Sequence, residues 1–423
     1  MNKRTFFSLA AVTGLVMIGG FSAYIAFASP RTAAYPLRIK QTALITTKTA
    51  SAPALFPATS TSAVVDAANA FLATLPESKR TIVLTTMTPQ NAARWSNFPA
   101  GVVQRNGVFF RDLTPEQVVA AMKVARLALS EEGFTRFQEV RAADDAFAKL
   151  DRGPGGGQGG RGRGGRGGFG GGPGGPGGAP PGSPGGFGGG QGGPPGGGFG
   201  GSGGRGPSGP GGGQNLFGAG NYTIAFLGQP SKTDPWLLQL GGHHLAFNLY
   251  YKGAAGTSTP YFVGAQPNTW KDADGKTHAP LAPMRDAMYS LVHSLSPDQQ
   301  TRARLKGSFN DVLVGPGQDG HFPNLKEGVS ASELSEASKT QLKKAIAAWT
   351  GDHVQSAAYR KRYDDELKQT KISYSGTTGV SASGDYVRID GPHLWIEFVC
   401  QGNDHYHTIW RDRETDYGAE FSF

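Results

Sequence analysis

The sequence predicts an α+β fold with a mainly antiparallel sheet and segregated helices, in one domain that a glycine-rich insertion interrupts. Two patterns lead to this prediction. Residues 61–150 have the apolar spacing of helices, whereas residues 214–423 contain short aromatic and β-branched runs separated by Gly and Pro. Because helical and strand-like segments are grouped rather than alternating, the pattern favours α+β over a parallel α/β sheet. Residues 151–213, mostly glycine, form the insertion.

The N-terminus has the pattern of a secretion signal. Two basic residues precede an apolar run over residues 6–27, which ends in the small-residue cleavage pattern Ala26-Phe27-Ala28. Residues 1–28 are therefore predicted to be a signal peptide, and the chain an exported, periplasmic or secreted protein of bacterial type. The run is also long enough to span a bilayer, so an uncleaved membrane anchor is the alternative. Residues 29–60 are predicted to be a flexible tether.

The charge distribution argues against a nucleic-acid partner. The formal charge is +9, but two basic residues lie in the signal and four arginines lie in the glycine-rich tract over residues 153–213. Removing these six charges from +9 leaves +3, which gives no electrostatic reason to bind a polyanion. Cys400 is the only cysteine, so an intramolecular disulfide is excluded, and it is predicted to be buried in a strand.

The glycine-rich tract is predicted to be disordered, because it cannot bury enough apolar area to offset its chain entropy. Its flanks, Leu150 and Gln214, should lie close enough for a short loop to join them. Replacing the tract by a short Gly/Ser linker is expected to leave the melting temperature nearly unchanged. A large fall in calorimetry would mean that the tract packs on the domain.

The first part of the domain is predicted to be helical. One helix covers residues 63–75, and a stronger one begins after the capping residue Thr114, with proline at its first position. A further helix is expected over residues 130–150 after a break near Gly133, and residues 95–110 are expected to be irregular or short-stranded. The apolar face of the second helix is predicted to comprise Val118, Val119, Met122, Ala125, Leu127 and Leu129.

The second part is predicted to begin and end with strands, with two helices between them. The helices are expected over residues 283–305 and 332–349, the latter with Ser332 as its cap. The strands are expected over residues 222–227, 236–251, 260–265, 372–375, 386–389, 393–400 and 405–411.

Four of the nine histidines fall into two tight groups on predicted strands, His243-His244 and His405-Tyr406-His407. Residues two apart on a strand project from the same face, so His405 and His407 can present both imidazoles to one ion. Consecutive residues point in opposite directions, so only one of His243 and His244 can join them. His244 is favoured because its face is the more polar one. An H-x-H strand pair with a distant histidine can hold Zn, Mn, Fe or Cu.

Glu397 is the natural carboxylate to complete such a metal site, because it interrupts an otherwise apolar strand and needs a partner. A three-residue hairpin turn would pair Cys400 with Asp404 and place Glu397 opposite His407. We predict this register, since a two- or four-residue turn would place Phe398 opposite His407 and point Glu397 to the other face. Alternative partners nearby are Asp404, Asp412 and Asp416, with Arg388 and Arg411 available to pair with them.

Two functions are consistent with these residues. The first is a metal-dependent hydrolase or oxidase, with metal ligands His244, His405, His407 and Glu397, and with Glu397, Arg411 and Asp412 as catalytic candidates. The second is a non-catalytic binding protein for a glycan or small ligand, in which the histidines form a purely structural hydrogen-bond network. In the binding protein, four aromatic residues would face an open cleft: Trp236, Tyr250, Trp395 and Trp410.

The two histidine groups also carry a resemblance to a known family. The patterns G-H-H-L at residues 242–245 and H-x-H-x-x-W-R-D at residues 405–412 resemble the bacterial family called domain of unknown function 3500. The resemblance runs from about residue 63 to the C-terminus apart from the glycine-rich tract. It implies one exported domain with an insertion, and it names no reaction. Further matching residues are Trp95, Arg105-Asn106-Gly107, the run over 226–230, Trp236, the run over 264–267, and Asp416-Tyr417-Gly418.

Overall fold

The structure is a computed structural model, and it describes residues 58–151 and 216–423. The predicted signal peptide, nearly all of the predicted tether and the glycine-rich tract lie outside these ranges. The end of the predicted tether is an exception, because residues 58–60 belong to the first helix.

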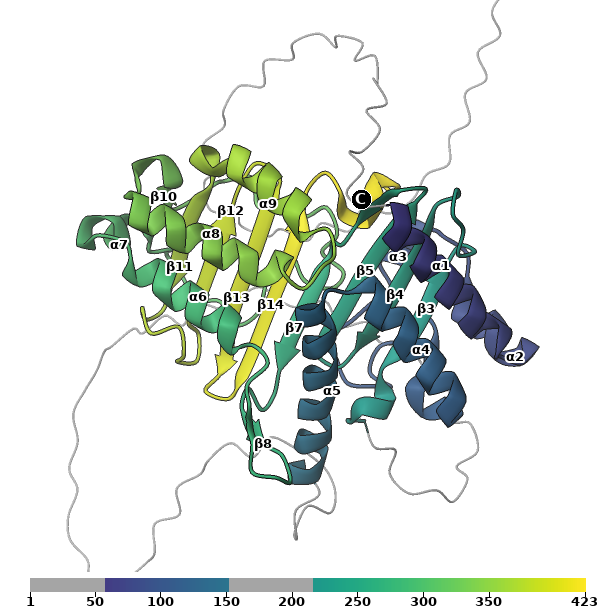
Figure 1. Cartoon of the computed structure of the whole chain (residues 1–423). Helices are drawn as coiled ribbons and strands as arrows, with labels where there is room; N and C mark the ends of the chain where they lie inside the picture. The colour runs from purple at the N-terminus through teal and green to yellow at the C-terminus, as the bar shows by residue number, and fades with distance from the viewer. Residues whose placement is uncertain (1–57, 152–215) are drawn as a thin grey trace, which may run out of the picture. The chain divides into compact units, whose positions relative to one another are not determined.

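Within the described residues, one twelve-stranded sheet runs in the order β1-β3-β4-β5-β7-β14-β13-β12-β11-β10, with β2 beside β3 and β6 beside β5 (Figure 1). Its pairs are antiparallel except β1 with β3, so the predicted mainly antiparallel α+β fold is confirmed. A separate pair, β8 with β9, forms a small hairpin. The strands are β1 (Leu84–Thr85), β2 (Val108–Phe109), β3 (Thr223–Leu227), β4 (Trp236–Gly242), β5 (Leu245–Lys252), β6 (Ala255–Thr257), β7 (Tyr261–Ala265), β8 (Trp270–Lys271), β9 (Thr277–His278), β10 (Val329–Ser330), β11 (Lys371–Ser375), β12 (Tyr386–Asp390), β13 (Leu394–Gly402) and β14 (His405–Asp412).

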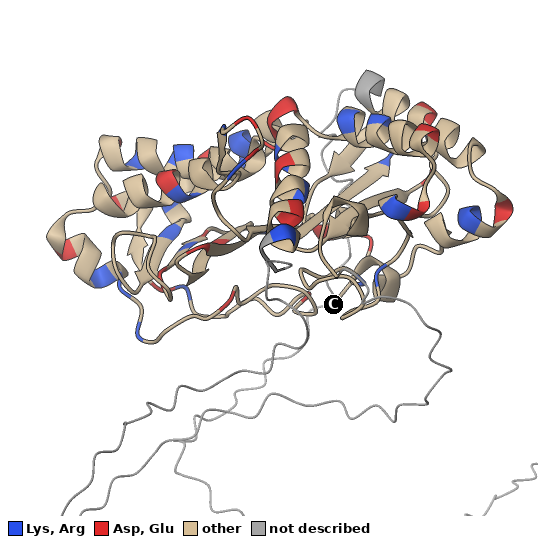
Figure 2. Cartoon of the chain, turned by 90° about the horizontal axis from the view of Figure 1, so that it is seen from below, with Lys and Arg blue, Asp and Glu red and all other residues tan. Residues whose placement is uncertain are grey.

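Helices cover one face of the sheet, and irregular segments cover the other (Figures 1 and 2). Figure 2 also shows acidic and basic residues interspersed along the helices. None of the described helices is long and apolar enough to cross a membrane. The α-helices are α1 (Ala58–Ala73), α2 (Glu77–Val83), α3 (Pro89–Ala92), α4 (Pro115–Ala128), α5 (Glu131–Asp151), α6 (Ala282–His293), α7 (Pro297–Ala303), α8 (Glu336–Thr350) and α9 (Ser356–Asp365).

The alternation of side chains along β14 separates two cores. Thr408 and Trp410 face the helices. Thr408 accepts a hydrogen bond from the indole N–H of Trp349 of α8, and the indole N–H of Trp410 donates to the hydroxyl of Tyr363 of α9. Ile409 faces the opposite side, where it belongs to a smaller core with Trp395 and the irregular segments. His405, His407 and Arg411 therefore also point to the face covered by irregular segments, because they are an even number of residues from Ile409.

The predicted helix start at Thr114 is confirmed in detail. Its hydroxyl accepts the backbone N–H of Gln117, and the Gln117 side chain accepts the N–H of Thr114, which completes a capping box. The predicted apolar face is partly wrong, because Val119 is 71% exposed whereas Ala121 and Val124 are buried. Ala121 and Val124 belong to the main hydrophobic core together with residues of α1.

The break before α5 lies at residues 129–130 and not near Gly133. Ser130 accepts the N–H of Gly133 and so caps the helix. Gly133 stands in the first turn of α5, where an added Cβ would meet the backbone carbonyl of Asp352 at 1.9 Å. The glycine is therefore required for close packing on the turn after α8, and it does not interrupt the helix.

Three predicted elements of the second part are divided or displaced. The strand over 236–251 is two strands joined by the turn His243-His244, and the helix over 283–305 is α6 and α7 with a capping box at Ser296. Ser332 lies in a short 3-10 helix, and Ser335 caps α8 instead. The hydroxyls of Ser296 and Ser335 accept backbone N–H groups and so set the starts of α7 and α8, whereas the turn at residues 243–244 divides the predicted strand.

The predicted register of the last hairpin is wrong. His407 pairs with Val399, and Glu397 pairs with Ile409. The strands are joined by a two-residue turn, and a bulge between Cys400 and Gly402 places one extra residue on β13. Glu397 thus shares a face with His407 but lies two residue pairs farther along the ladder.

A buried histidine outside the histidine groups gives a pH-dependent prediction. His353 packs among the rings of Phe247, Tyr261 and Trp410, and within the described residues neither of its ring nitrogens has a hydrogen-bond partner. Burial, reinforced by Arg136, lowers its pKa to about 3. Below the unfolded pKa of about 6.5, the unfolded chain therefore takes up a proton that the folded chain refuses, and stability falls as the pH falls.

A His353→Phe variant is expected to lose this part of the acid sensitivity. The difference in unfolding free energy between the variant and the wild type should change in favour of the variant by about 1.4 kcal/mol for each unit that the pH falls from 6 to 4. Urea unfolding at pH 7, 6, 5 and 4 measures the difference. If the unfolding free energies of the two proteins changed equally with pH, the conclusion that His353 stays neutral in the folded chain would be contradicted.

Candidate metal centre

Three histidines from two hairpins bring their ring nitrogens together. His244 stands in the turn between β4 and β5, whereas His405 and His407 begin β14. The Nε2 atom of His405 lies 2.8 Å from Nε2 of His244 and 3.0 Å from Nε2 of His407. Three imidazoles directed at one point can hold a metal ion. In the described part of the chain, no carboxylate or thiolate belongs to this group.

Strand β7 allows the two hairpins to meet, because it lies between β5 and β14. Gly264 of β7 pairs with His407, and its N–H donates to the carbonyl of His244 at 2.7 Å. A Cβ at this position would approach the carbonyl oxygen of Tyr406 to 2.7 Å, Cδ2 of His407 to 2.9 Å and Cδ2 of His244 to 3.1 Å. Glycine therefore makes room for both imidazoles. The sequence signal was a glycine inside a predicted strand, which often marks a close approach.

A Gly264→Ala variant is expected to weaken zinc binding about 10-fold or more, the scale of changes in groups that orient metal ligands. The methyl group pushes the His244 and His407 rings apart. Competition with a chromogenic chelator measures the affinity. Gly402→Ala is the matched control, since its Cβ meets only ordinary contacts at 3.6 Å or more. Equal affinities for the two variants would contradict the role of Gly264.

The backbone of His244 is held in an uncommon conformation. Its φ is +62°, in the left-handed region, which is sparsely populated by residues other than glycine. Its N–H donates to the carbonyl of Asn97, and its own carbonyl accepts from Gly264. The prediction that only one residue of the pair joins the group holds, but the reason differs: both residues lie in a turn and not on a strand.

Asp311 orients His407 from an irregular segment. Its Oδ1 lies 2.9 Å from Nδ1 of His407 and also accepts the N–H of Val312 at 2.7 Å. A carboxylate on Nδ1 fixes the proton there and leaves Nε2 free to bind a metal. Asp311 was not predicted, because it lies 96 residues from His407 and no local sequence pattern marks it.

The environment of His244 and His405 favours their neutral forms. Burial, reinforced by the neighbouring imidazoles, holds the pKa of His244 well below its usual range and lowers that of His405 to about 3. A histidine must be unprotonated to bind a metal, so the site is prepared for an ion at neutral pH. His244 and His407 are buried, and His405 is only partly buried, so solvent reaches the group at His405.

Glu397 does not contact the histidine group, so its predicted role as a ligand is wrong. Its carboxylate accepts the N–H groups of Leu313 and Val314 at 2.7 and 3.1 Å, the hydroxyl of Tyr386 at 2.7 Å and the indole N–H of Trp395 at 2.8 Å. Burial raises its pKa, and these bonds oppose the rise. Glu397 fastens the segment that follows Asp311 to the sheet.

Arg411 likewise binds the irregular segments. It donates to Asp319 at 3.0 Å and Asp416 at 2.9 Å, and to the carbonyl of Val314 at 2.7 Å. Arg411 lies four residues beyond His407 on the same strand, a distance of roughly 13 Å. It has no described contact with the imidazoles.

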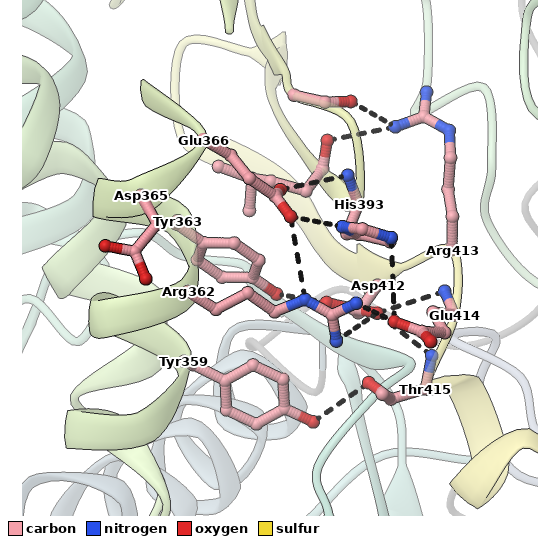
Figure 3. Close-up of polar contacts among 12 residues, drawn as sticks. Tyr359, Arg362, Tyr363, Asp365, Glu366, His393, Asp412, Arg413, Glu414 and Thr415 are labelled. Carbon is pink, nitrogen blue, oxygen red and sulfur yellow. Dashed lines mark hydrogen bonds and ion pairs between the residues drawn. The ribbon is translucent and has the colours of Figure 1, made fainter. Parts of the chain in front are cut away.

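Asp412 points to the helix side, into a different polar cluster (Figure 3). It accepts the hydroxyl of Tyr363 at 2.9 Å and the N–H groups of Glu414 and Thr415. These contacts close the turn after β14 and tie it to α9. Neither Arg411 nor Asp412 is brought to the histidine group.

The aromatic residues of the alternative binding function do not line an open cleft. The three tryptophans are fully buried, and Tyr250 is 4% exposed. They also do not surround the histidine group, since Trp410 packs on His353 and Trp236 stacks on Tyr251. The buried aromatics therefore serve the two cores. The tryptophans concerned are Trp236, Trp395 and Trp410.

Comparison with known proteins gives a family but no activity. A family model described as "Protein of unknown function (DUF3500)" matches residues 57–419. This match covers most of the chain and confirms the resemblance carried by the G-H-H-L and H-x-H-x-x-W-R-D patterns. No curated protein and no solved structure matches the chain.

Proposed function

We propose that this chain, which belongs to the DUF3500 family, is a metalloprotein that binds one divalent transition metal through His244, His405 and His407. The position of Nε2 of His405 within hydrogen-bonding distance of Nε2 of both His244 and His407 carries the proposal. A neutral imidazole has one N–H, so the Nε2–H of His405 would have to be shared between two acceptors, whereas a bound ion would occupy all three nitrogens. Asp311 on His407 supports a metal further, because metal-binding histidines generally have such an acceptor.

We propose hydrolysis of a small-molecule substrate as the reaction. Three protein ligands leave a position for water on zinc, and zinc lowers the pKa of that water to about 7. Imidazole ligands also suit copper and iron, with which the site would support oxidation, whereas manganese prefers oxygen ligands. The partial exposure of His405 gives a substrate access to the ion.

Elemental analysis of the purified full chain tests the metal. The expected result is one equivalent of zinc per chain. A variant in which His244, His405 and His407 are all replaced by Ala is expected to contain none. Stoichiometric copper or iron would favour oxidation over hydrolysis as the reaction. Metal far below one equivalent after incubation with each ion would contradict the proposal and leave the histidines structural.

Activity is tested with a panel of chromogenic esters, phosphoesters and amides. Hydrolysis that a chelator abolishes and zinc restores is expected for at least one class. The triple alanine variant should remain inactive after zinc is added, which distinguishes the site from adventitious zinc. Activity that survives in this variant would contradict catalysis at the histidine group.

We also propose that the chain is exported, on the basis of the signal pattern over residues 1–28. Mass spectrometry of the protein from the periplasm or medium is expected to give a chain beginning at Ser29. A full-length chain in the membrane fraction would favour the anchor instead. A full-length chain in the cytoplasm would contradict export.

A further inference from the structure

We propose that Asp144 and His243 are positioning residues for the metal ligand His244, and that they connect the metal centre to the stem. The stem comprises residues 141–147 of α5 and residues 217–219, the two described segments that flank residues 152–215. This inference rests on the proposed metal-binding function. It assigns a role to His243, the histidine of the G-H-H-L pattern that the metal centre does not use.

The two sides of the stem are joined by both polar and aromatic contacts. The Phe147 and Phe217 rings are 4.8 Å apart and edge to face. Asp145 accepts the N–H of Ala219 at 2.8 Å, and Arg141 donates to the Ala219 carbonyl at 3.0 Å. The chain therefore leaves α5 and returns beside it.

Asp144 extends these contacts to the histidine pair. One carboxylate oxygen accepts the N–H of Gly218 at 2.7 Å, and the other lies 2.6 Å from Nδ1 of His243. Asp144 and His243 are 2% and 6% exposed, so both side chains are largely shielded from water. The Phe217 ring also contacts the His243 ring, with centroids 5.1 Å apart. The same carboxylate thus holds the stem closed and fixes His243.

His243 in turn supports the ligand next to it. The rings of His243 and His244 lie 3.7 Å apart with an angle of 31° between their planes. The hydroxyl of Tyr222 donates to the His243 carbonyl, so both the side chain and the backbone of His243 are fixed. The left-handed backbone of His244 is unfavourable for a residue other than glycine, and it persists only where its surroundings hold it. Releasing His243 therefore loosens the turn that aims His244.

Asp145 provides a matched comparison, because it makes a stem bond of the same kind but does not touch His243. Asp144→Ala is expected to weaken zinc binding about 10–100-fold, the scale for residues that orient metal ligands. It should also change the visible absorption spectrum of the cobalt-substituted protein. Asp145→Ala should lower the melting temperature but leave the zinc affinity and the cobalt spectrum unchanged. Chelator competition with zinc alone and cobalt spectroscopy on the full chain make the measurement.

Equal zinc affinities and cobalt spectra for wild type and Asp144→Ala would overturn the inference while leaving the metal site intact. Equal losses in both variants would also overturn it, because they would reflect only the opening of the stem. A wild-type chain that binds no metal would instead overturn the proposed function. If Asp144→Ala does not fold, His243→Phe keeps a ring beside Phe217 and cannot bond to Asp144, and the same loss of affinity is expected.

Discussion

A His407→Ala variant is expected to bind zinc at least ~1000-fold more weakly than the wild-type chain, beyond the 10–100-fold typical of changes in outer groups. His407 supplies one of three ligands, and its loss also leaves Asp311 without the ring that it orients. Metal-dependent stabilisation should disappear as well, since an ion that binds only the folded chain raises its melting temperature. Titration against a chelator and calorimetry with and without zinc measure both effects.

Two variants calibrate this result. Asp311→Asn should show an intermediate loss of about 10–100-fold, because the amide oxygen can still accept from Nδ1 but carries no charge. His321→Ala removes an exposed histidine outside the group and should leave the affinity unchanged. Similar losses for His407→Ala and His321→Ala would mean that zinc binds the surface histidines nonspecifically.

A Glu397→Leu variant is expected to lose about 4 kcal/mol of stability, because each buried donor left without an acceptor costs about 1–3 kcal/mol and losses at neighbouring groups are not additive. Leucine keeps much of the volume but accepts none of the four hydrogen bonds, so two backbone N–H groups, a hydroxyl and an indole N–H are left unpaired. The segment that follows Asp311 then loses its two bonds to Glu397 and keeps its bonds to Arg411. Urea unfolding measures the loss, and a weaker zinc affinity should accompany it.

Glu397→Gln is the conservative comparison, and it should lose less stability than Glu397→Leu because one carbonyl oxygen remains to accept. Glu336→Ala, at a highly exposed carboxylate, should leave the unfolding midpoint unchanged. If Glu397→Leu lost metal binding with no loss of stability, the carboxylate would belong to the metal site after all.

Local patterns in the sequence were sufficient for most individual elements. The capping box of Thr114 and the strand runs around residues 223–227 and 386–390 depend on neighbours within a few residues, so their spacing was enough to predict them. The same logic placed His405 and His407 on one face of a strand. The errors arose where a single residue changes the geometry, as with the bulge that shifts Glu397 from His407 to Ile409.

The sequence by itself determined the fold class, and it singled out the three histidines and the oddly placed Glu397. Only the tertiary structure decided what these residues contact. His244 meets His405 and His407 because β7 lies between their strands and has glycine at the meeting point, and Asp311 reaches His407 from an irregular segment 96 residues away. The alternation of residues along a strand predicts which face of that strand each side chain occupies. Strand order, register and the path of the covering segments depend on the packing of the whole chain. They therefore decide whether the carboxylate of Glu397 contacts the metal site or backbone N–H groups.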